Sequence, residues 1–495
     1  MSVKKGKISR KKWNNSFMEW FSDILLNAEI IDYRFNLKGC GVWLGYGFNL
    51  RKRVFQILRD LLDNTPIPHE ETLFPLLIPE PLFMKEAEHV KGFEEEVYWV
   101  TRGGLKQLDI NLCLRPTSET VMYPMFKLWI RSHQDLPIKI YQIVSTFRYE
   151  TKTTRPLIRV RELTTFKEAH TAHATAKEAE DQVKEGLEIY SKFYDRLGIP
   201  YIINIRPDYD KFPGAEYSIA FETIFPGDHK TLQIGTVHNL GSIFAKTFDL
   251  TYKADNGETK FVHQTCYGIS ERAIAAVVTL HGDDAGLCLP PEVAPIQTII
   301  VPIIFKGKEK EIIEQSKNLL EKITSLGIRT KLDDSDISAG KKFYKWETKG
   351  VPIRIELGPK DIEKKLFIVV RRDTGERITL NFKEGAKEIP KILEQIQKDL
   401  CERAKTLMEN SIKETNDYDE LYNLIEKRVG IVIVPLCDDY NCAEQIEKRT
   451  EGKIIGTPIK FVKEFSKEYS EKEFNFNCIV CARPTKRKMI IGRSY

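Results

Sequence analysis

Residues 146–170 constrain the fold most, because charged side chains alternate with apolar ones on two neighbouring arms of this stretch. The first arm carries Arg148 and Glu150, and the second carries Arg159 and Arg161. Period-two alternation on both sides of a polar loop predicts an antiparallel hairpin with one charged face. An arginine fork binds phosphate or carboxylate through two parallel hydrogen bonds, so a phosphorylated ligand is one interpretation. A solvated strand face with internal Arg–Glu pairs is the other.

Further motifs follow in order along the chain. They are RPTSET from Arg115, TFKEAHTAH from Thr165, LQIGTVHNLG from Leu232 and YGISERAIA from Tyr267. The FRYE segment at Phe147 resembles motif 2 of the class II aminoacyl-tRNA synthetases. The whole series resembles the archaeal/eukaryotic type of prolyl-tRNA synthetase over nearly all of the chain. The resemblance implies a proline–tRNA ligase that uses ATP to form prolyl-adenylate and transfers proline to tRNA(Pro).

Other interpretations stay open. A non-catalytic relative that binds tRNA is expected to lack the arginines of motifs 2 and 3, whereas Arg148, Arg159 and Arg272 are all present. A synthetase for threonine, histidine or glycine shares the general plan, although the TSE and HTAH pieces favour proline. A structural interaction protein is disfavoured by so many ordered matches. The chain carries neither a G-x-x-x-x-G-K-[ST] loop nor a G-x-G-x-x-G fingerprint, so an ATP site would have to be built without a glycine-rich phosphate-binding loop.

Length and composition limit the number of domains and the kinds of binding partner that the chain can have. With 495 residues, 42% hydrophobic and 30% charged, the chain is long enough for about three globular domains. A net charge of +5 cannot drive strong non-specific RNA binding, so tRNA contacts would use local patches. No apolar run approaches the roughly 20 residues of a membrane helix. The basic start lacks the apolar core of a signal peptide, which predicts a cytoplasmic protein with no membrane contact.

The order of expected elements divides the chain into three parts. Long antiparallel strands with few helices predict an α+β fold for residues 1–290, the class II synthetase sheet flanked by helices. Alternating strands and helices in residues 291–385 predict a small α/β domain that resembles an anticodon-binding domain. Residues 386–495 are expected to form a long charged helix and a small α/β zinc-binding domain. No long insertion separates Thr171 from Tyr267, so no built-in editing domain is expected.

Local patterns predict individual elements of the first part. Residues 51–64 carry apolar positions at helical spacing, and a short apolar strand lies between Pro75 and Pro79. This helix–strand unit resembles motif 1, which implies a homodimer. Thr175 and Glu178 form a capping box that predicts the start of a long helix.

The resemblance also implies an ATP site. Arg148 would contact the α-phosphate and the attacking carboxylate, Arg159 the phosphates and Arg272 the γ-phosphate. This chain has one residue more after Arg159 than related chains, so Arg161 could take its place. The other implied residues are Phe93, Glu96 and Val97 over the adenine, Glu150 at adenine or ribose, Glu222 and Gln233 at nucleotide and magnesium, and Thr236 and Ser270 at the nucleotide. Magnesium binds one or two carboxylates plus phosphate oxygens, which suits this sparse set.

For the amino acid, the resemblance implies carboxylates for the secondary ammonium of proline and apolar walls for its ring. The implied residues are Thr117, Glu119, Arg148, Phe166, Glu168, His170 and His238. The spacing of His170 and His173 leaves a metal pair open, but the sequence shows no third ligand. A core or network histidine is the commoner role.

Four residues of the second part match positions that contact the proline anticodon in the family. They are Glu347, Arg354, Lys360 and Asp361. Arginine pairs with guanine O6 and N7, and acids can accept hydrogen bonds from the guanine amino group. Taken alone, these residues are ordinary surface charges.

The nine cysteines fall into two groups. Cys437 and Cys442, followed later by Cys478 and Cys481, have the spacing of a tetrahedral site with four thiolate ligands, which predicts a structural Zn²⁺. Inert core cysteines are the alternative. The isolated cysteines are expected to be small buried hydrophobes: Cys40, Cys113, Cys266, Cys288 and Cys401.

Tyr495 is the last residue of the chain. In the family, a terminal tyrosine carboxylate reaches toward the active site. A frayed tail is the alternative that the sequence alone favours.

Overall fold

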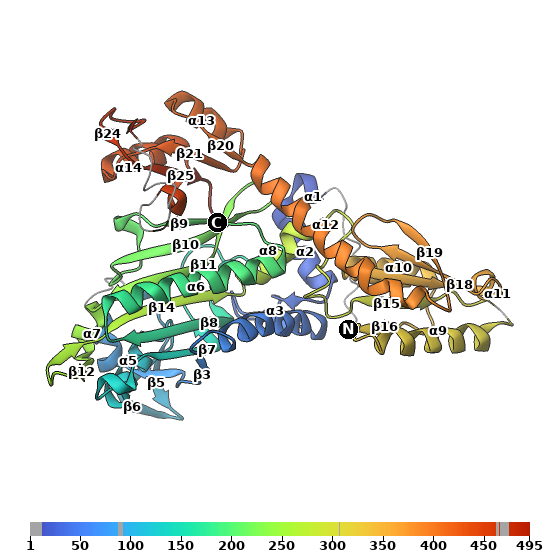
Figure 1. Ribbon diagram of the computed structural model, residues 1–495, viewed down its shortest axis with the longest axis horizontal. Helices are drawn as coiled ribbons and strands as arrows, with labels where there is room; N and C mark the ends of the chain where they lie inside the picture. Colours follow the sequence, from blue (N-terminus) through green and yellow to red (C-terminus); the bar gives the residue numbers. More distant parts are fainter. Residues whose placement is uncertain (1–11, 88–92, 306, 462–464, 466–474) are drawn as a thin grey trace.

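In a computed structural model of the chain, the two sheets with the most strands are a large one of eleven and a small one of five, and the long helix α12 (Ile389–Asn410) runs between them (Figure 1). The residues that it describes are 12–87, 93–305, 307–461, 465 and 475–495. In this part of the chain, no helix is long and apolar enough to cross a membrane.

The large sheet has eleven strands. In spatial order these are β20 (Ile412–Glu414), β21 (Ile431–Pro435), β25 (Lys488–Gly492), β22 (Lys453–Pro458), β9 (Ile202–Ile205), β10 (Tyr217–Ile224), β11 (Thr231–Gly241), β14 (His263–Ser270), β8 (Glu162–His173), β7 (Ile138–Phe147) and β3 (Glu70–Glu71). Neighbouring strands are antiparallel except at the two edges. The predicted antiparallel sheet flanked by helices is therefore confirmed.

Helices cover one face of this sheet and supply its core. Helix α6 (Ala176–Leu197) lies along the sheet in Figure 1 and buries Val183, Tyr190 and Tyr194 against it. The predicted capping box at its start is present, because the Thr175 side chain accepts from the Glu178 backbone N–H. The other helices of this part are α1 (Lys12–Asn15), α2 (Phe17–Asn27), α3 (Gly45–Asp63), α4 (Glu80–Ala87), α5 (Glu119–Trp129), α7 (Ile243–Phe248) and α8 (Arg272–His281).

The predicted charged hairpin is correct in its pairing and wrong in its extent. Strand β7 ends before Arg148, and β8 begins only after Arg161. One backbone hydrogen bond, from Arg148 N to Arg161 O at 2.9 Å, continues the ladder. Leu157 has a φ of 56°, outside the extended region, and Arg161 N donates to Gly39 O at 3.0 Å. The arginines therefore lie on a loop that the rest of the fold holds, and not on strand faces.

The region that resembles motif 1 contains the predicted helix, which is α3, and the predicted strand, which is β4. Strand β4 belongs to a separate three-stranded sheet in the order β4–β6–β5. Its strands are β4 (Leu77–Pro79), β6 (Lys106–Leu114) and β5 (Trp99–Gly103). The remaining strands of the first part form two short pairs, β1 (Ile31–Asp32) with β2 (Val42–Trp43) and β12 (Thr251–Lys253) with β13 (Thr259–Phe261).

The second part has the predicted small mixed sheet, in which β15 pairs in parallel with two neighbours and the other pairs are antiparallel. In spatial order its strands are β16 (Thr330–Leu332), β15 (Thr298–Pro302), β17 (Ile353–Leu357), β18 (Leu366–Arg371) and β19 (Arg377–Asn381). Its helices are α9 (Glu309–Thr324), α10 (Ala339–Thr348), α11 (Pro359–Glu363) and α12 (Ile389–Asn410).

The C-terminal part extends the large sheet instead of standing apart from it. Strand β22 pairs with β9 through Thr457 and Ile205, so strands of the C-terminal part and of the first part share one sheet. The remaining elements here are α13 (Tyr418–Glu426), α14 (Tyr440–Thr450), β23 (Phe476–Asn477) and β24 (Pro484–Thr485). The division of the chain at residues 290 and 385 stays a prediction.

Candidate active site and metal centre

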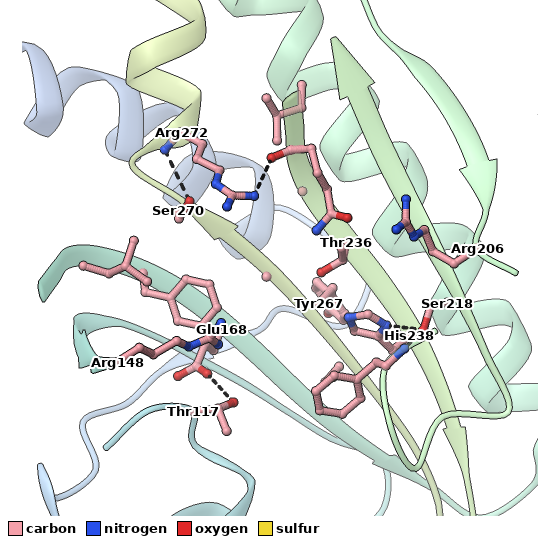
Figure 2. A pocket seen from close by; sticks show the side chains of 18 of the residues that line it. Thr117, Arg148, Glu168, Arg206, Ser218, Thr236, His238, Tyr267, Ser270 and Arg272 are labelled. Atoms are coloured by element: carbon pink, nitrogen blue, oxygen red, sulfur yellow. Dashed lines mark hydrogen bonds between the residues drawn. The ribbon is translucent and has the colours of Figure 1, made fainter. Parts of the chain in front are cut away.

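A cavity of about 460 Å³ lies on the face of the large sheet opposite α6. It brings together most of the residues that the sequence singled out. Those that line it are Thr117, Glu119, Arg148, Glu150, Arg159, Phe166, Glu168, His170, Gln233, Thr236, His238, Ser270 and Arg272. Figure 2 shows Arg272 at one end and the Thr117–Glu168 pair at the other.

Three arginines converge on this cavity. Arg272 is held by the backbone, since its Nε donates to Ile158 O at 2.9 Å and its Nη1 donates to Gln233 O at 3.1 Å. Burial lowers the pKa of Arg272 to about 10, and the charges of Arg148 and Arg159 add to this effect. Positive charge gathered in a partly buried cleft attracts a polyanion.

The two candidates for the second motif 2 arginine lie in different places. Arg159 lines the cavity, with its Nε 3.9 Å from Glu150 Oε2. Arg161 instead lies over the Tyr149 ring at 4.3 Å and donates to the Glu150 backbone oxygen at 3.2 Å. This arrangement favours Arg159 as the residue that would contact a phosphate.

Two carboxylates lie at the other end of the cavity. The Thr117 hydroxyl contacts both, at 2.5 Å from Glu119 Oε2 and 3.0 Å from Glu168 Oε1, and the Ser118 hydroxyl also donates to Glu168. Burial raises the pKa of Glu119 and of Glu168, and the Glu119 charge raises the pKa of Glu168 further. Two buried carboxylates that share one hydroxyl partner favour a bound cation, such as an ammonium group.

The two histidines that line the cavity, His170 and His238, are buried and neutral. Burial lowers the pKa of His170 to about 4 and that of His238 to about 3. Tyr123 Oη lies 3.1 Å from His170 Nδ1, and Ser218 Oγ lies 2.7 Å from His238 Nδ1. His173 lies three residues from His170 on the same strand, so it faces the opposite side of the sheet. The two histidines therefore cannot form the metal pair that their spacing left open.

A second cavity of about 740 Å³ adjoins the first and is bounded by the C-terminal part of the chain. Arg159, Gln233 and Arg272 line both cavities, whereas Glu222 lines only the second. Tyr495 also lines the second cavity, and its Oη donates to Asp228 Oδ2 at 2.6 Å. The last residue is therefore packed beside the site and is not a frayed tail.

Of the three residues expected over the adenine, the two whose side chains the structure describes do not line the cavity. Glu96 and Val97 are not among the described residues that line either cavity; Glu96 is exposed and Val97 is buried in a hydrophobic cluster. The Glu96 backbone oxygen accepts from Tyr149 N at 2.7 Å, beside the loop that carries Arg148. The Phe93 side chain lies outside the described residues.

The four anticodon candidates divide into two pairs. Glu347 and Arg354 line a pocket of about 190 Å³ on the small sheet. Lys360 and Asp361 lie on α11, where Asp361 Oδ2 accepts from Gly358 N at 2.8 Å. Lys360 and Asp361 are not among the described residues that line the pocket.

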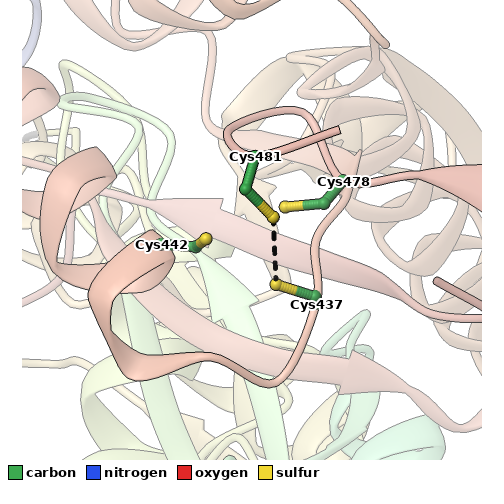
Figure 3. Close-up of side chains that lie close together, drawn as sticks. All are labelled: Cys437, Cys442, Cys478 and Cys481. Atoms are coloured by element: carbon green, nitrogen blue, oxygen red, sulfur yellow. Dashed lines mark hydrogen bonds between the residues drawn. The ribbon is translucent and has the colours of Figure 1, made fainter. Parts of the chain in front are cut away.

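The four paired cysteines meet in space, with all sulfur atoms within 4.8 Å of one another (Figure 3). Cys437 Sγ lies 3.8 Å from Cys481 Sγ. Tetrahedral zinc with Zn–S bonds of about 2.3 Å separates its sulfur ligands by roughly 3.8 Å. Cys437, Cys442, Cys478 and Cys481 therefore fit a Zn²⁺ site. Of the isolated cysteines, Cys401 alone is partly exposed and the others are buried.

The sequence did not point to Arg206, Tyr123 or Ser218. Arg206 follows β9 and lines both cavities, and its Nη1 donates to Ile455 O at 2.7 Å in the C-terminal part. Tyr123 and Ser218 hold the two site histidines. In the sequence, the only indication of a role for Arg206, Tyr123 and Ser218 is that they lie near a motif, and many residues without a role in the site also do.

The antiparallel sheet and its arginine-lined cavity define a class II aminoacyl-tRNA synthetase. Family models agree: residues 98–281 match the class II tRNA synthetase core domain for G, H, P, S and T, residues 297–392 the anticodon binding domain, and residues 418–495 the prolyl-tRNA synthetase C-terminal domain.

Individual relatives narrow the class to one family. Proline–tRNA ligase of Methanopyrus kandleri is 51% identical over 97% of this chain and 96% of its own length. That of Methanocaldococcus jannaschii is 55% identical over 89% of this chain and 96% of its own. A solved structure of Giardia lamblia prolyl-tRNA synthetase in complex with prolyl-adenylate has a TM-score of 0.91 and 33% identity, covering 99% of both chains. The chain belongs to the proline–tRNA ligase family, as its motifs predicted.

Proposed function

We propose that this protein activates L-proline with ATP and transfers it to the 3′ end of tRNA(Pro). The observation that carries the proposal is the first cavity, where Arg148, Arg159 and Arg272 face the buried carboxylates Glu119 and Glu168. A cleft with cations at one end and anions at the other can hold a nucleotide triphosphate beside an amine. Family membership supports proline as that amine.

The reaction consists of two displacements, both aided by position and fixed charge. In the first, the proline carboxylate attacks the α-phosphate and pyrophosphate leaves; Arg148 holds both reacting anions. Arg159 and Arg272 hold the outer phosphates and stabilise the negative charge that develops on them. In the second, a ribose hydroxyl of the tRNA attacks the adenylate and AMP leaves.

The amino-acid end of the cavity would select a compact cyclic amine. Glu119 and Thr117 bind the secondary ammonium, Glu168 adds a second negative charge, and Phe166 supplies an apolar wall. Neutral His170 and His238 border the ring without adding a positive charge that would repel the ammonium.

The remaining predicted nucleotide contacts and the metals also belong to this proposal. Magnesium, when bound, neutralises phosphate charge, and Glu222 and Gln233 would hold it. Glu150, Thr236 and Ser270 would contact the nucleotide, and Phe93, Glu96 and Val97 would cover the adenine. The four cysteines would hold a structural Zn²⁺, because four thiolates leave no open coordination position.

The partners and the compartment follow from the same reaction. Glu347 and Arg354, with Lys360 and Asp361 on α11, would contact the anticodon of tRNA(Pro). The reaction supplies the ribosome, so the proposed compartment is the cytoplasm.

A homodimer is the proposed assembly, because large apolar side chains are exposed around the three-stranded sheet. They are Leu73, Leu76, Leu77, Met84, Trp99, Leu105, Ile110, Leu128 and Trp129. Exposed apolar surface of this extent marks an interaction site.

The test is aminoacylation of a tRNA(Pro) transcript by the purified protein with ATP and radiolabelled amino acids. We expect L-proline to be attached, and threonine, histidine and glycine not to be. Attachment of one of those three in place of proline would contradict the proposed substrate, and the absence of any attachment would favour a non-catalytic relative.

A further inference from the structure

Glu119, His170 and Cys266 bring three metal-binding side chains together at the amino-acid end of the first cavity. Their ligand atoms lie within 4.8 Å of one another, and all three residues are buried. The sheet register pairs Cys266 of β14 directly with His170 of β8. Glu119 reaches them from the first turn of α5, with its Oε1 4.0 Å from Cys266 Sγ.

The chemistry and the orientation of these groups suit zinc. Thiolate sulfur, imidazole nitrogen and carboxylate oxygen are the three donors that Zn²⁺ takes in proteins, and sites with three protein ligands keep one position open. Tyr123 Oη lies 3.1 Å from His170 Nδ1, so Nε2 is the ring nitrogen that would bind the metal. A hydrogen bond to the other ring nitrogen is what orients histidine ligands in metal sites.

The site also lies within reach of solutes. All three residues line the first cavity, so an ion that enters the cavity can meet them. Glu168 lies beside Glu119, since one Thr117 hydroxyl contacts both carboxylates, and its negative charge favours a bound cation. The cluster is separate from the four paired cysteines, which form a group of their own.

We propose that Glu119, His170 and Cys266 form a second zinc site, which competes with the amine of the amino acid for this end of the cavity. Binding releases the thiol proton of Cys266 to solvent, and the metal takes the Glu119 carboxylate that the ammonium would otherwise contact. Zinc at this position reversibly inhibits amino-acid activation. The identity of the competing amine rests on the proposed function, whereas the metal site does not.

The metal site is tested on the full-length protein, whose four-cysteine cluster is first filled with zinc. Cobalt(II) is then titrated as the probe, because a cobalt–thiolate bond gives a charge-transfer absorption band. We expect the band to appear, and Cys266→Ala to remove it and to weaken binding of the additional metal at least about tenfold. Cys401→Ala, at a partly exposed cysteine on α12, is the matched control and should keep the band. Cys266→Ser provides a second variant if the alanine protein melts at a lower temperature.

A titration in which no metal binds beyond the four-cysteine cluster would overturn the inference. So would a cobalt band that persists in both Cys266 variants.

Competition is tested separately, by proline-dependent ATP–pyrophosphate exchange with and without added zinc. We expect zinc to raise the KM for proline and leave kcat unchanged, and proline to bleach the cobalt band. The ratio of activities with and without zinc should approach one in Cys266→Ala. A protein that exchanges proline normally but binds no metal beyond the four-cysteine cluster would refute this inference alone. Metal binding at Cys266 that proline does not displace, in a protein without proline exchange, would instead refute the proposed function.

Discussion

Glu222 Oε1 lies 3.7 Å from Arg206 Nη1; Arg206 lines both cavities, and Glu222 lines the second. Glu222 is 3% exposed, and burial raises its pKa to about 7, although the charges of Arg206 and Arg272 oppose the shift. The folded protein therefore holds this proton more tightly than the unfolded chain does. As a result, ionisation of Glu222 lowers the free energy of unfolding as the pH rises from its ordinary pKa of 4.5 to about 7.

The same proton should control nucleotide binding. Magnesium needs the ionised carboxylate, so we predict that the affinity for Mg²⁺–ATP increases as the pH rises through about 7. Glu222→Gln should weaken the affinity and flatten this pH dependence in calorimetric titrations. Glu188→Gln, at an exposed position of α6, is the control and should retain the wild-type profile. A Glu222→Gln profile that rises as steeply as the wild type would assign the proton to another group.

The two neighbouring arginines of the motif 2 loop should differ in their effect on catalysis. Arg159→Ala removes a cation from the cavity, so we predict a loss of kcat of about 100-fold in pyrophosphate exchange. Arg161→Ala removes a contact with Tyr149 and should cost much less. Steady-state kinetics with ATP as the varied substrate distinguishes the two variants. A larger loss in Arg161→Ala would reverse the assignment.

The cysteine cluster should stabilise the C-terminal part of the chain. We predict that Cys478→Ser lowers the zinc content measured by elemental analysis and lowers the Tm, because metal binding contributes directly to folding. Cys401→Ser leaves the four ligands intact and should keep both values. A native protein that carries no zinc after purification without chelators would contradict this role.

Sequence patterns predicted those parts of the fold whose structure is determined by residues close together in the sequence. The capping box at Thr175 and Glu178 determines where α6 begins, and the structure confirms it. The charged arms were predicted less well, because a loop with Leu157 at positive φ replaces the expected strand ends. Alternation in the sequence cannot reveal that the backbone of Arg161 bonds to Gly39 instead of to a strand.

Pairing between strands that are far apart in the sequence accounts for the features that the sequence did not predict. Cys266 looked like an isolated core cysteine, and only the pairing of β14 with β8 brings it to His170. Similarly, the pairing of Thr457 with Ile205 joins the C-terminal part to the large sheet. Such contacts depend on which strands are neighbours, and no spacing within one segment encodes that order.

The exposed apolar residues around the three-stranded sheet should form the dimer interface. Leu73 is 82% exposed, and we predict that Leu73→Glu shifts the protein toward monomers because a charge would be buried between subunits. Leu326→Glu, at an exposed leucine after α9, is the matched control. Sedimentation velocity measures both variants. A wild-type protein that sediments as a monomer at all concentrations would contradict the assembly.

Whether the first cavity activates proline is tested by ATP–pyrophosphate exchange dependent on L-proline, measured for the wild type and for Arg148→Ala. The Arg148 side chain lines the first cavity, where its Nε lies 3.4 Å from the Pro116 backbone oxygen. We predict robust exchange in the wild type and its loss in Arg148→Ala, with an unchanged Tm for the variant. Exchange that persists unchanged in Arg148→Ala would contradict the proposed role of Arg148 in proline activation.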